Sequence, residues 1–224
     1  MELLNQNYMK IIERINKAKE KSGRQKDEIK LIAVTKGIRS KAIKKAASLG
    51  IVHFGENRVQ EVLPKMEGLP EHLEWHFIGH LQSNKVKDVL PRFSLIHSLD
   101  RISLAKEINK RSEKENRVTD VLVQVNVAKE KSKFGLSVQE TEGFIEKVVE
   151  KFPYIKILGL MTIAPYVEDA QEVRPIFREL RNLAQEIVIP GAELTELSMG
   201  MSNDFEVAVE EGATMVRIGS ALFR

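Results

Sequence analysis

The sequence predicts a single α/β domain built as a (β/α)8 barrel (a TIM barrel) with an extra helix at its N-terminus. Short apolar segments rich in β-branched residues alternate with longer segments of helical periodicity, a pattern typical of parallel βαβ units. Eight strands can be recognised in this way, the number that closes a barrel. The 224 residues also fit one large domain, although a typical barrel has about 250 residues.

The elements are expected in a regular order along the chain. Residues 3–22 form an amphipathic helix, since Leu4, Ile11 and Ile15 fall on one face. The expected strands are 31–35, 51–54, 75–78, 95–97, 121–125, 157–160, 196–199 and 215–218. The expected helices between them are 40–49, 58–66, 84–90, 101–112, 138–151, 170–188 and 204–211, and a polar loop is expected at 128–135.

No linker or change of composition divides the chain. We therefore expect one domain, 1–224, in which residues 1–25 carry the N-terminal helix packed on the barrel. The 35 basic and 32 acidic residues are interspersed, which argues against a nucleic-acid surface. The sequence has no cysteine, no secretory signal and no apolar run of membrane-spanning length. These features predict a cytoplasmic protein without membrane or nucleic-acid partners.

Polar residues gather just beyond the ends of the predicted strands. In a parallel barrel these carboxyl ends meet at one mouth, where ligands bind. The residues in question are Lys36, Asn57, His80, Asp100, Asn126, Thr162, Ser202 and Ser220. They predict a ligand site at the mouth of the barrel.

The last two turns match the place where barrels often bind phosphate, between the loops after strands seven and eight. Ser202 and the pair Gly219–Ser220 offer hydroxyls and backbone N–H groups there. The structural alternative is that Ser202 or Asn203 caps a helix and that Gly219–Ser220 is a simple turn. Sequence alone leaves both interpretations open.

Lys36 ends the run 31–36, directly after the first predicted strand, and is followed at once by Gly37. A charged amine at the end of a buried strand costs desolvation energy unless something uses it. A buried lysine can instead supply a neutral, nucleophilic amine for a Schiff base. The simpler alternative is a surface lysine whose ammonium reaches solvent, and this segment by itself favours that alternative.

Arg217 and the histidines also admit two interpretations. Arg217 projects from the last strand toward the barrel interior or the site, where it pairs with a ligand or with a structural partner. His80, His76 and His53 fit hydrogen-bonded structural roles better than catalytic ones. Neither the HEXXH pattern nor a helical pair of histidines at metal-ligand spacing occurs, so we expect no metal site.

Other catalytic signatures are missing from the sequence. It contains no GxSxG elbow, no P-loop and no GxGxxG after a strand. Glu56 and Asp100 are either acid/base groups or residues that orient Asn57, Arg58 or Arg101. Sequence alone leaves both interpretations open.

Six stretches together carry a resemblance to a known family. They are AVTK at 33–36, FGENRVQE at 54–61, WHFIGHLQSNK at 75–85, GLMT at 159–162, LSMGMSND at 197–204 and VRIGSALF at 216–223. In these residues and their order the chain resembles the pyridoxal 5'-phosphate homeostasis proteins, the YggS/PROSC family. The stretches run from the first strand to the C-terminus, so the resemblance covers nearly the whole chain.

The resemblance implies a fold type III pyridoxal 5'-phosphate (PLP) protein, like the N-terminal domain of alanine racemase. It implies that PLP is held as a covalent aldimine on Lys36. The other cofactor-binding residues that it implies are Ser202, Gly219 and Ser220 for the phosphate, Arg217 for the pyridine nitrogen, and Asn57, His80, Met161 and Ser198 in the lining.

Three hypotheses about function follow. The first is a non-catalytic, monomeric protein that buffers PLP and transfers it, with apo PLP-dependent enzymes as candidate recipients. The second is a weak or narrow amino-acid racemase. Racemases of this fold have a further domain and a second base, a tyrosine, for which only Tyr166 could substitute here. The third is a phosphate-binding barrel without PLP, in which Lys36 only pairs with charge.

Overall fold

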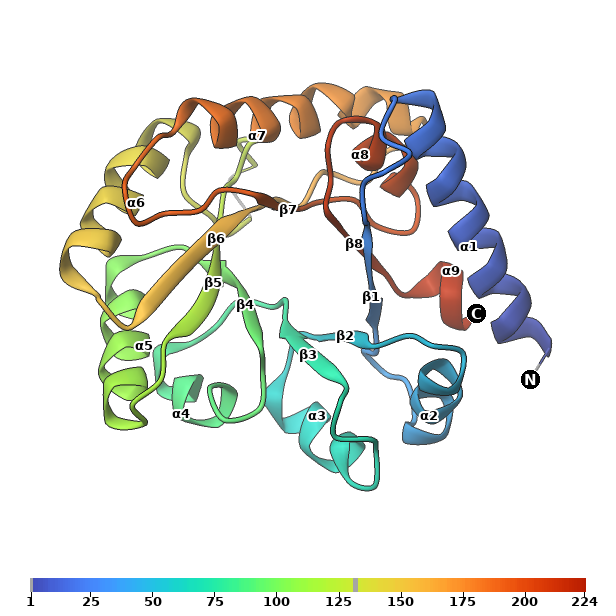
Figure 1. Cartoon of the computed structure of the whole chain (residues 1–224), viewed down its shortest axis with the longest axis horizontal. Coiled ribbons are helices and arrows are strands. Elements are labelled where there is room, and N and C mark those ends of the chain that lie inside the picture. Colours follow the sequence, from blue (N-terminus) through green and yellow to red (C-terminus); the bar gives the residue numbers. More distant parts are fainter. Residues whose placement is uncertain (1, 131–132) are drawn as a thin grey trace.

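The computed structural model describes residues 2–130 and 133–224 and shows a closed barrel of eight parallel strands. The strands follow one another around the barrel in sequence order, and β1 pairs with β8 to close it (Figure 1). The predicted fold class is therefore confirmed. The centre of the loop predicted at 128–135 lies outside the described residues.

The strands lie close to their predicted positions. Their bounds are β1 (Lys30–Val34), β2 (His53–Glu56), β3 (Glu74–Phe77), β4 (Leu95–Leu99), β5 (Thr119–Gln124), β6 (Ile155–Met161), β7 (Glu196–Ser198) and β8 (Met215–Ile218). The longest of them, β6, pairs closely with β7 because Gly159 carries no side chain. A Cβ at that position would lie 1.8 Å from the carbonyl oxygen of Glu196.

The helices form a layer outside the strands. They are α1 (Glu2–Lys21), α2 (Ser40–Ser48), α3 (Val59–Met66), α4 (Val86–Val89), α5 (Ile102–Lys114), α6 (Val138–Lys151), α7 (Arg174–Glu186), α8 (Phe205–Glu210) and α9 (Ser220–Phe223). The helix predicted at 170–188 is divided into η2 (Ala170–Val173) and α7. Pro175 explains this break, because proline has no N–H to donate to the carbonyl oxygen of Gln171, as a continuous α-helix would require.

Two further differences concern short elements. The helix predicted at 84–90 consists of η1 (Ser83–Lys85) and α4. α9 had no counterpart in the prediction, since four residues are too few to show a helical period.

The barrel interior has an apolar part and a polar part. An inner cluster, separate from the main core under the helices, contains Ile32, Leu95, Leu122, Met161 and Met215. The polar part is made by buried side chains of β3, β4, β7 and β8, namely His76, His97, Ser198 and Arg217. Hydrogen bonds between them cross the interior, because β4 and β7 are not neighbours in the barrel.

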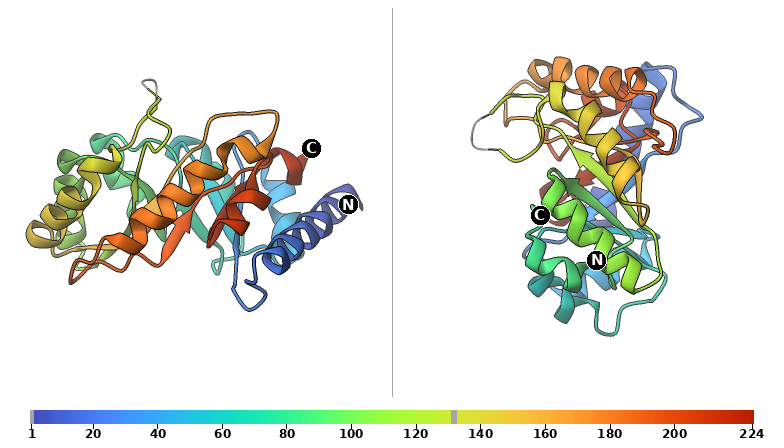
Figure 2. Two further views of the ribbon diagram at one scale, coloured as in Figure 1. Left: turned by 90° about the horizontal axis from the view of Figure 1, so that it is seen from above. Right: turned by 90° about the vertical axis from the view of Figure 1, so that its left-hand side faces the viewer.

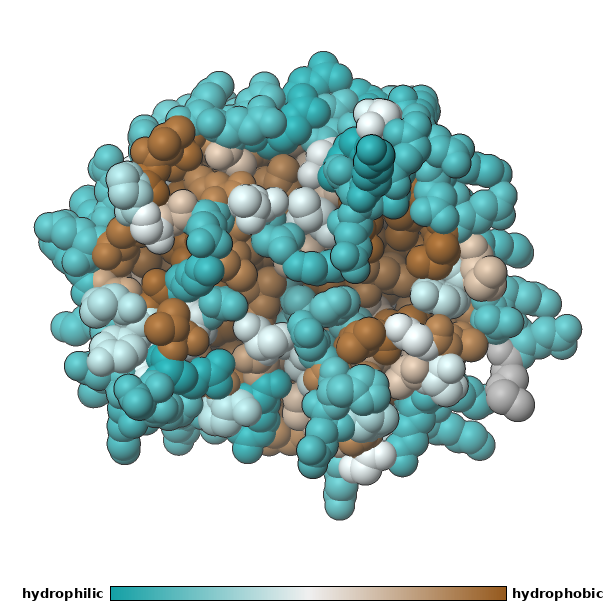
Figure 3. Space-filling view, in the orientation of Figure 1, coloured by the Kyte–Doolittle hydropathy of each residue, from teal (hydrophilic) through white to brown (hydrophobic). Residues whose placement is uncertain are grey.

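The N-terminal helix α1 packs beside α8 and α9, and the two chain ends lie near each other at one edge (Figures 1 and 2). Arg14 of α1 forms a bidentate pair with Glu206 of α8 and lies 4.5 Å from the centre of the Phe205 ring. Hydrophilic side chains cover the outer rim of the molecule, with apolar ones nearer its centre (Figure 3). Within the described residues, no helix has the length and apolar character needed to cross a bilayer.

Candidate functional site

A cavity of about 510 Å³ opens at the mouth of the barrel, where the strands have their carboxyl ends. Its apolar wall includes Val34, Ile78, Ile163 and Val167. Of the nine residues that the family resemblance implied for cofactor binding, the cavity is lined by Lys36, Asn57, His80, Ser202, Arg217, Gly219 and Ser220.

Met161 and Ser198 lie deeper and are not part of the cavity lining. Met161 is fully buried in the inner apolar cluster. Ser198 is also fully buried and accepts a hydrogen bond from Arg217 Nη1 at 2.6 Å. The structure therefore places these two residues behind the site, where they support lining residues.

Lys36 has an exposed side chain at the cavity. Its backbone is fixed by Thr35, whose N–H donates to the carbonyl oxygen of Gly55 at 3.0 Å and whose hydroxyl donates to Glu56 Oε1 at 2.6 Å. Gly37 follows with a φ of 70°, a backbone conformation that favours glycine. The chain thus turns after Lys36, closed by a hydrogen bond from the N–H of Ile38 to the carbonyl oxygen of Thr35 at 2.9 Å, and the amine stands at the mouth just beyond the end of β1.

Glu56 does not line the cavity but supports it from behind. Its carboxylate is fully buried and pairs with Lys65 of α3, which also donates to the carbonyl oxygen of Thr35 at 2.8 Å. Asp100, the other carboxylate considered from the sequence, binds Arg101 at 2.6 Å and lies 3.5 Å from His80 Nδ1. The pair with Arg101 agrees with the alternative that Asp100 orients a neighbouring side chain instead of acting as an acid/base group.

The loops after β7 and β8 meet at the cavity, as the phosphate-site prediction requires. The Ser202 hydroxyl accepts a hydrogen bond from the N–H of Ala221 at 3.3 Å and so joins the two loops. Asp204 Oδ1 accepts from the N–H of Met201 at 2.5 Å, which closes the first loop into a tight turn. Gly200 allows this turn to pack on α8, because a Cβ there would lie 2.6 Å from that of Ala208.

Arg217 reaches the cavity from the buried interior. Its Nη1 donates to Ser198 and its Nη2 donates to the carbonyl oxygen of Thr162 at 2.7 Å, so both described partners are neutral. Burial lowers the pKa of Arg217 to about 10, although the negative charge of the Asp204 carboxylate acts in the opposite direction and raises this pKa. The guanidinium therefore remains cationic at neutral pH.

One wall of the cavity holds polar atoms that the described residues leave unpaired. Asn57 Oδ1 and His80 Nδ1 are both buried without a hydrogen-bond partner, although the Asp100 carboxylate lies within ion-pair distance of His80. The His80 ring stacks on Phe134, with ring centres 3.7 Å apart, although residue Phe134 is 55% exposed. Sequence reasoning missed Phe134 and Gln124 as lining residues, since no motif marks either one.

Comparison with known proteins gives consistent relationships over the whole chain. The family described as "Alanine racemase, N-terminal domain" matches residues 7–224. A protein named "Pyridoxal phosphate homeostasis protein" from Aquifex aeolicus (strain VF5) is 50% identical over 216 residues, covering 96% of this chain and 94% of its own. The protein of the same name from Escherichia coli (strain K12) is 36% identical over 222 residues, covering 97% and 94%.

Solved structures agree with these sequence relationships. PipY of Synechococcus elongatus PCC7942, determined with PLP bound, is 37% identical with a TM-score of 0.78, and the match covers 88% of this chain and 92% of PipY. Diaminopimelate decarboxylase from M. jannaschii superimposes with a TM-score of 0.75 at 17% identity, covering 98% of this chain and 59% of its own. At that identity the second likeness shows the barrel fold alone.

Proposed function

Because this chain belongs to the family of pyridoxal phosphate homeostasis proteins, built on the alanine racemase N-terminal domain, we propose that it binds PLP as a Schiff base on Lys36. In this proposal the protein buffers PLP and passes it on, without substantial catalysis of its own. The observation that carries the proposal is the convergence of three groups on one cavity. They are the Lys36 amine, the Arg217 guanidinium and the two loops that contain Ser202 and Ser220.

The residues present fit the chemical parts of PLP. The apolar wall suits a planar ring, while the hydroxyls of Ser202 and Ser220 and the backbone at Gly219 offer hydrogen bonds to a phosphate. The unpaired Asn57 Oδ1 is a second sign, because a buried polar atom without a hydrogen-bond partner among the described residues is available to a ligand. When PLP is bound, its aldehyde can condense with a neutral lysine amine to a Schiff base with loss of water.

The surroundings of Arg217 favour binding over turnover. A cation beside the pyridine nitrogen disfavours protonation of that nitrogen by like-charge repulsion. A ring that is not protonated is a weaker electron sink, so chemistry at the amino-acid Cα is muted. Ser198 and Thr162 hold the guanidinium in place without neutralising it.

Amino-acid turnover tests the non-catalytic part of the proposal. We expect the PLP-loaded protein to exchange the Cα hydrogen of amino acids for deuterium no faster than free PLP at the same concentration. The measurement is a panel of L-amino acids in heavy water followed by NMR. Sustained racemisation well above the free cofactor would support the racemase alternative, and its dependence on Tyr166, which is exposed at the cavity, would be tested with Tyr166→Phe.

The two serines at the loops give a binding prediction. The double variant Ser202→Ala and Ser220→Ala should bind PLP on the order of 100-fold more weakly, since each hydrogen bond to a charged group contributes about 1.5 kcal/mol or more. Equilibrium dialysis with PLP measures the change. Ser48→Ala is the matched control, because Ser48 is exposed on α2 and lies outside the cavity lining. Unchanged affinity in the double variant would move the phosphate site elsewhere.

A further inference from the structure

Below the cavity, a continuous chain of side-chain hydrogen bonds runs through the barrel. Arg217 donates to Ser198 Oγ at 2.6 Å, and Ser198 Oγ lies 2.9 Å from His97 Nδ1. His97 Nε2 lies 3.0 Å from His76 Nδ1, and His76 Nε2 lies 3.1 Å from His53 Nδ1. We name Ser198, His97, His76 and His53 the histidine relay. It links the cavity to the opposite end of the barrel, since His53 is the first residue of β2.

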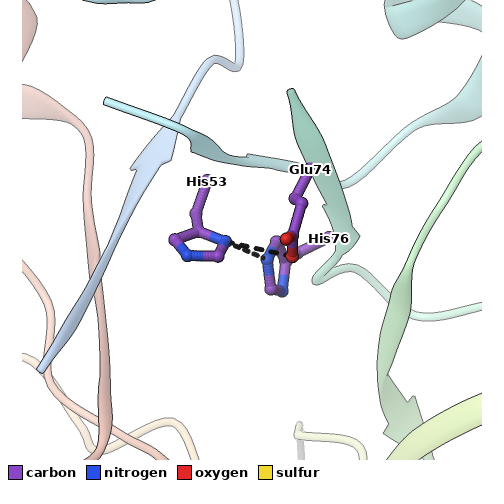
Figure 4. Close-up of side chains that lie close together, drawn as sticks. All are labelled: His53, Glu74 and His76. Atoms are coloured by element: carbon purple, nitrogen blue, oxygen red, sulfur yellow. Dashed lines mark hydrogen bonds and ion pairs between the residues drawn. The ribbon is translucent and has the colours of Figure 1, made fainter. Parts of the chain in front are cut away.

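The outer end of the relay carries an acidic partner. Glu74, the first residue of β3, is paired in register with His53, and its Oε2 lies 3.4 Å from His53 Nδ1. The dashed contacts in Figure 4 run from His53 to both His76 and Glu74. The side chains of His53 and Glu74 are 23% and 52% exposed, whereas His76 and His97 are buried. Solvent therefore reaches the relay at this end.

The two interior rings are neutral. Each uses both ring nitrogens in the relay, and each can do so as one donor and one acceptor only in the neutral form. Burial lowers the pKa of His76 to about 3 and the pKa of His97 well below its ordinary value. The other charged groups that act on these rings are Lys30 of β1, which pairs with Glu196 of β7 at 2.5 Å, and Arg217 of β8.

The inner end of the relay favours one direction of donation. Arg217 can only donate, so Ser198 Oγ accepts from it. Among the described residues, the remaining partner for the serine hydroxyl hydrogen is His97 Nδ1. The hydrogens of His97 and His76 then lie on Nε2, and His53 Nδ1 accepts. The opposite direction leaves a buried hydroxyl hydrogen without an acceptor, which is unfavourable.

The outer end favours the opposite direction once His53 is charged. A protonated His53 has a hydrogen on Nδ1, which faces the Glu74 carboxylate and forces His76 Nε2 to accept. His76 and His97 then each carry their single hydrogen on Nδ1, and the Ser198 hydroxyl hydrogen turns away from His97. This reversed state holds one proton more than the forward state, taken from solvent and residing on His53.

We propose that the histidine relay has two directions and that protonation of His53 at the far end of the barrel selects between them, thereby setting how Ser198 holds Arg217. In the forward state Ser198 Oγ accepts from Arg217 alone. In the reversed state it accepts from both Arg217 and His97, so two donors share it and the hold on the guanidinium weakens. His53, His76 and His97 are thus positioning residues for Arg217. The consequence for the cofactor rests on the proposed function, but the relay itself does not.

The test is NMR of the full-length, ligand-free protein labelled with 15N in its histidines. Long-range 1H–15N correlations report which ring nitrogen carries hydrogen, between about pH 8 and about pH 5, where imidazole gains a proton. We expect His76 and His97 to carry hydrogen on Nε2 at high pH and on Nδ1 at low pH. The change should share the midpoint of the His53 titration. Two results would overturn the proposal. One is hydrogen on His97 Nδ1 over the whole pH range, and the other is that the hydrogens of His76 and His97 do not change position when His53 is protonated.

Two variant pairs sharpen the experiment. In His53→Asn, the ring hydrogens of His76 and His97 should stay on the same nitrogens across the pH range. In His72→Asn, at an exposed site, they should still change nitrogen as the pH falls. Glu74→Gln should lower the midpoint of His53 and of both interior rings together, and exposed Glu71→Gln should not. Midpoints that move for His53 alone would contradict coupling along the relay.

The effect on the cofactor is measured separately. In the PLP-loaded protein, retention of PLP should fall about fivefold through the same midpoint, the loss expected for one weakened hydrogen bond. His53→Asn should remove this pH dependence. Reversal of the rings without any change in retention would overturn the relay's role at the cofactor site. Because the NMR measurement needs no ligand, its outcome is independent of whether PLP binds.

Discussion

Replacing Lys36 with alanine is expected to abolish the absorption band of protein-bound PLP and to weaken PLP retention by on the order of 100-fold or more. The reason is that the amine stands at the cavity mouth just beyond the end of β1, where the hydrogen bonds of Thr35 to Gly55 and Glu56 fix the backbone. A lysine held at one position beside the aldehyde acts at a high effective concentration. Visible absorption and equilibrium dialysis measure the two effects.

Lys36→Arg separates a covalent role from a purely electrostatic one. Arginine keeps the positive charge at the cavity, but its guanidinium is protonated at neutral pH and does not form the Schiff base. We therefore expect Lys36→Arg to lose PLP retention and absorption as Lys36→Ala does. Lys41→Ala is the matched control, since Lys41 is an exposed lysine of the adjacent helix α2. Wild-type retention and absorption in Lys36→Arg would contradict the Schiff base and favour a site that only pairs with the charge of a phosphate.

Replacing Lys65 with methionine is expected to lower the free energy of unfolding by about 3–5 kcal/mol. The substitution leaves the Glu56 carboxylate buried without its charge partner, and it removes the hydrogen bond to the carbonyl oxygen of Thr35. Chemical denaturation with urea measures the change through the unfolding midpoint. The same loss should loosen the strand end that carries Lys36, so PLP retention is expected to fall as well.

A second variant identifies the origin of that loss. The double variant Glu56→Gln and Lys65→Met removes both charges and should recover most of the lost stability, because the neutral amide can still accept from Thr35. Lys41→Met, at an exposed position on α2, should change stability by less than about 0.5 kcal/mol. A double variant as unstable as Lys65→Met would show that an unpaired charge is not the cause.

Much of the architecture could be predicted from local pattern. Apolar runs alternating with helical periods define a parallel barrel, and a barrel brings its strand ends to one mouth whatever the details of its loops. Lys36, Ser202 and Ser220 could therefore be assigned to one site before the structure was known, and all three line the cavity. The break before α7 was missed because the apolar stripe continues through Pro175.

The remaining features depend on contacts that cross the barrel. The bond between His97 and Ser198 joins residues 101 positions apart on strands that are not neighbours, and no sequence spacing indicates it. The pairing of Lys65 with Glu56 depends on how α3 packs on the end of β2. The family resemblance implied that Met161 and Ser198 belong to the lining, but their side chains are buried below it.

Whether Lys36 carries PLP can be determined by borohydride reduction of the PLP-loaded protein followed by peptide mass mapping. Reduction converts a Schiff base into a stable secondary amine and so marks the lysine that formed it. We predict one modified peptide, with the added mass on Lys36 and loss of the absorption band on reduction. Modification spread over exposed lysines such as Lys41, or an unmodified Lys36 in loaded protein, would show that Lys36 is not the residue that forms the Schiff base.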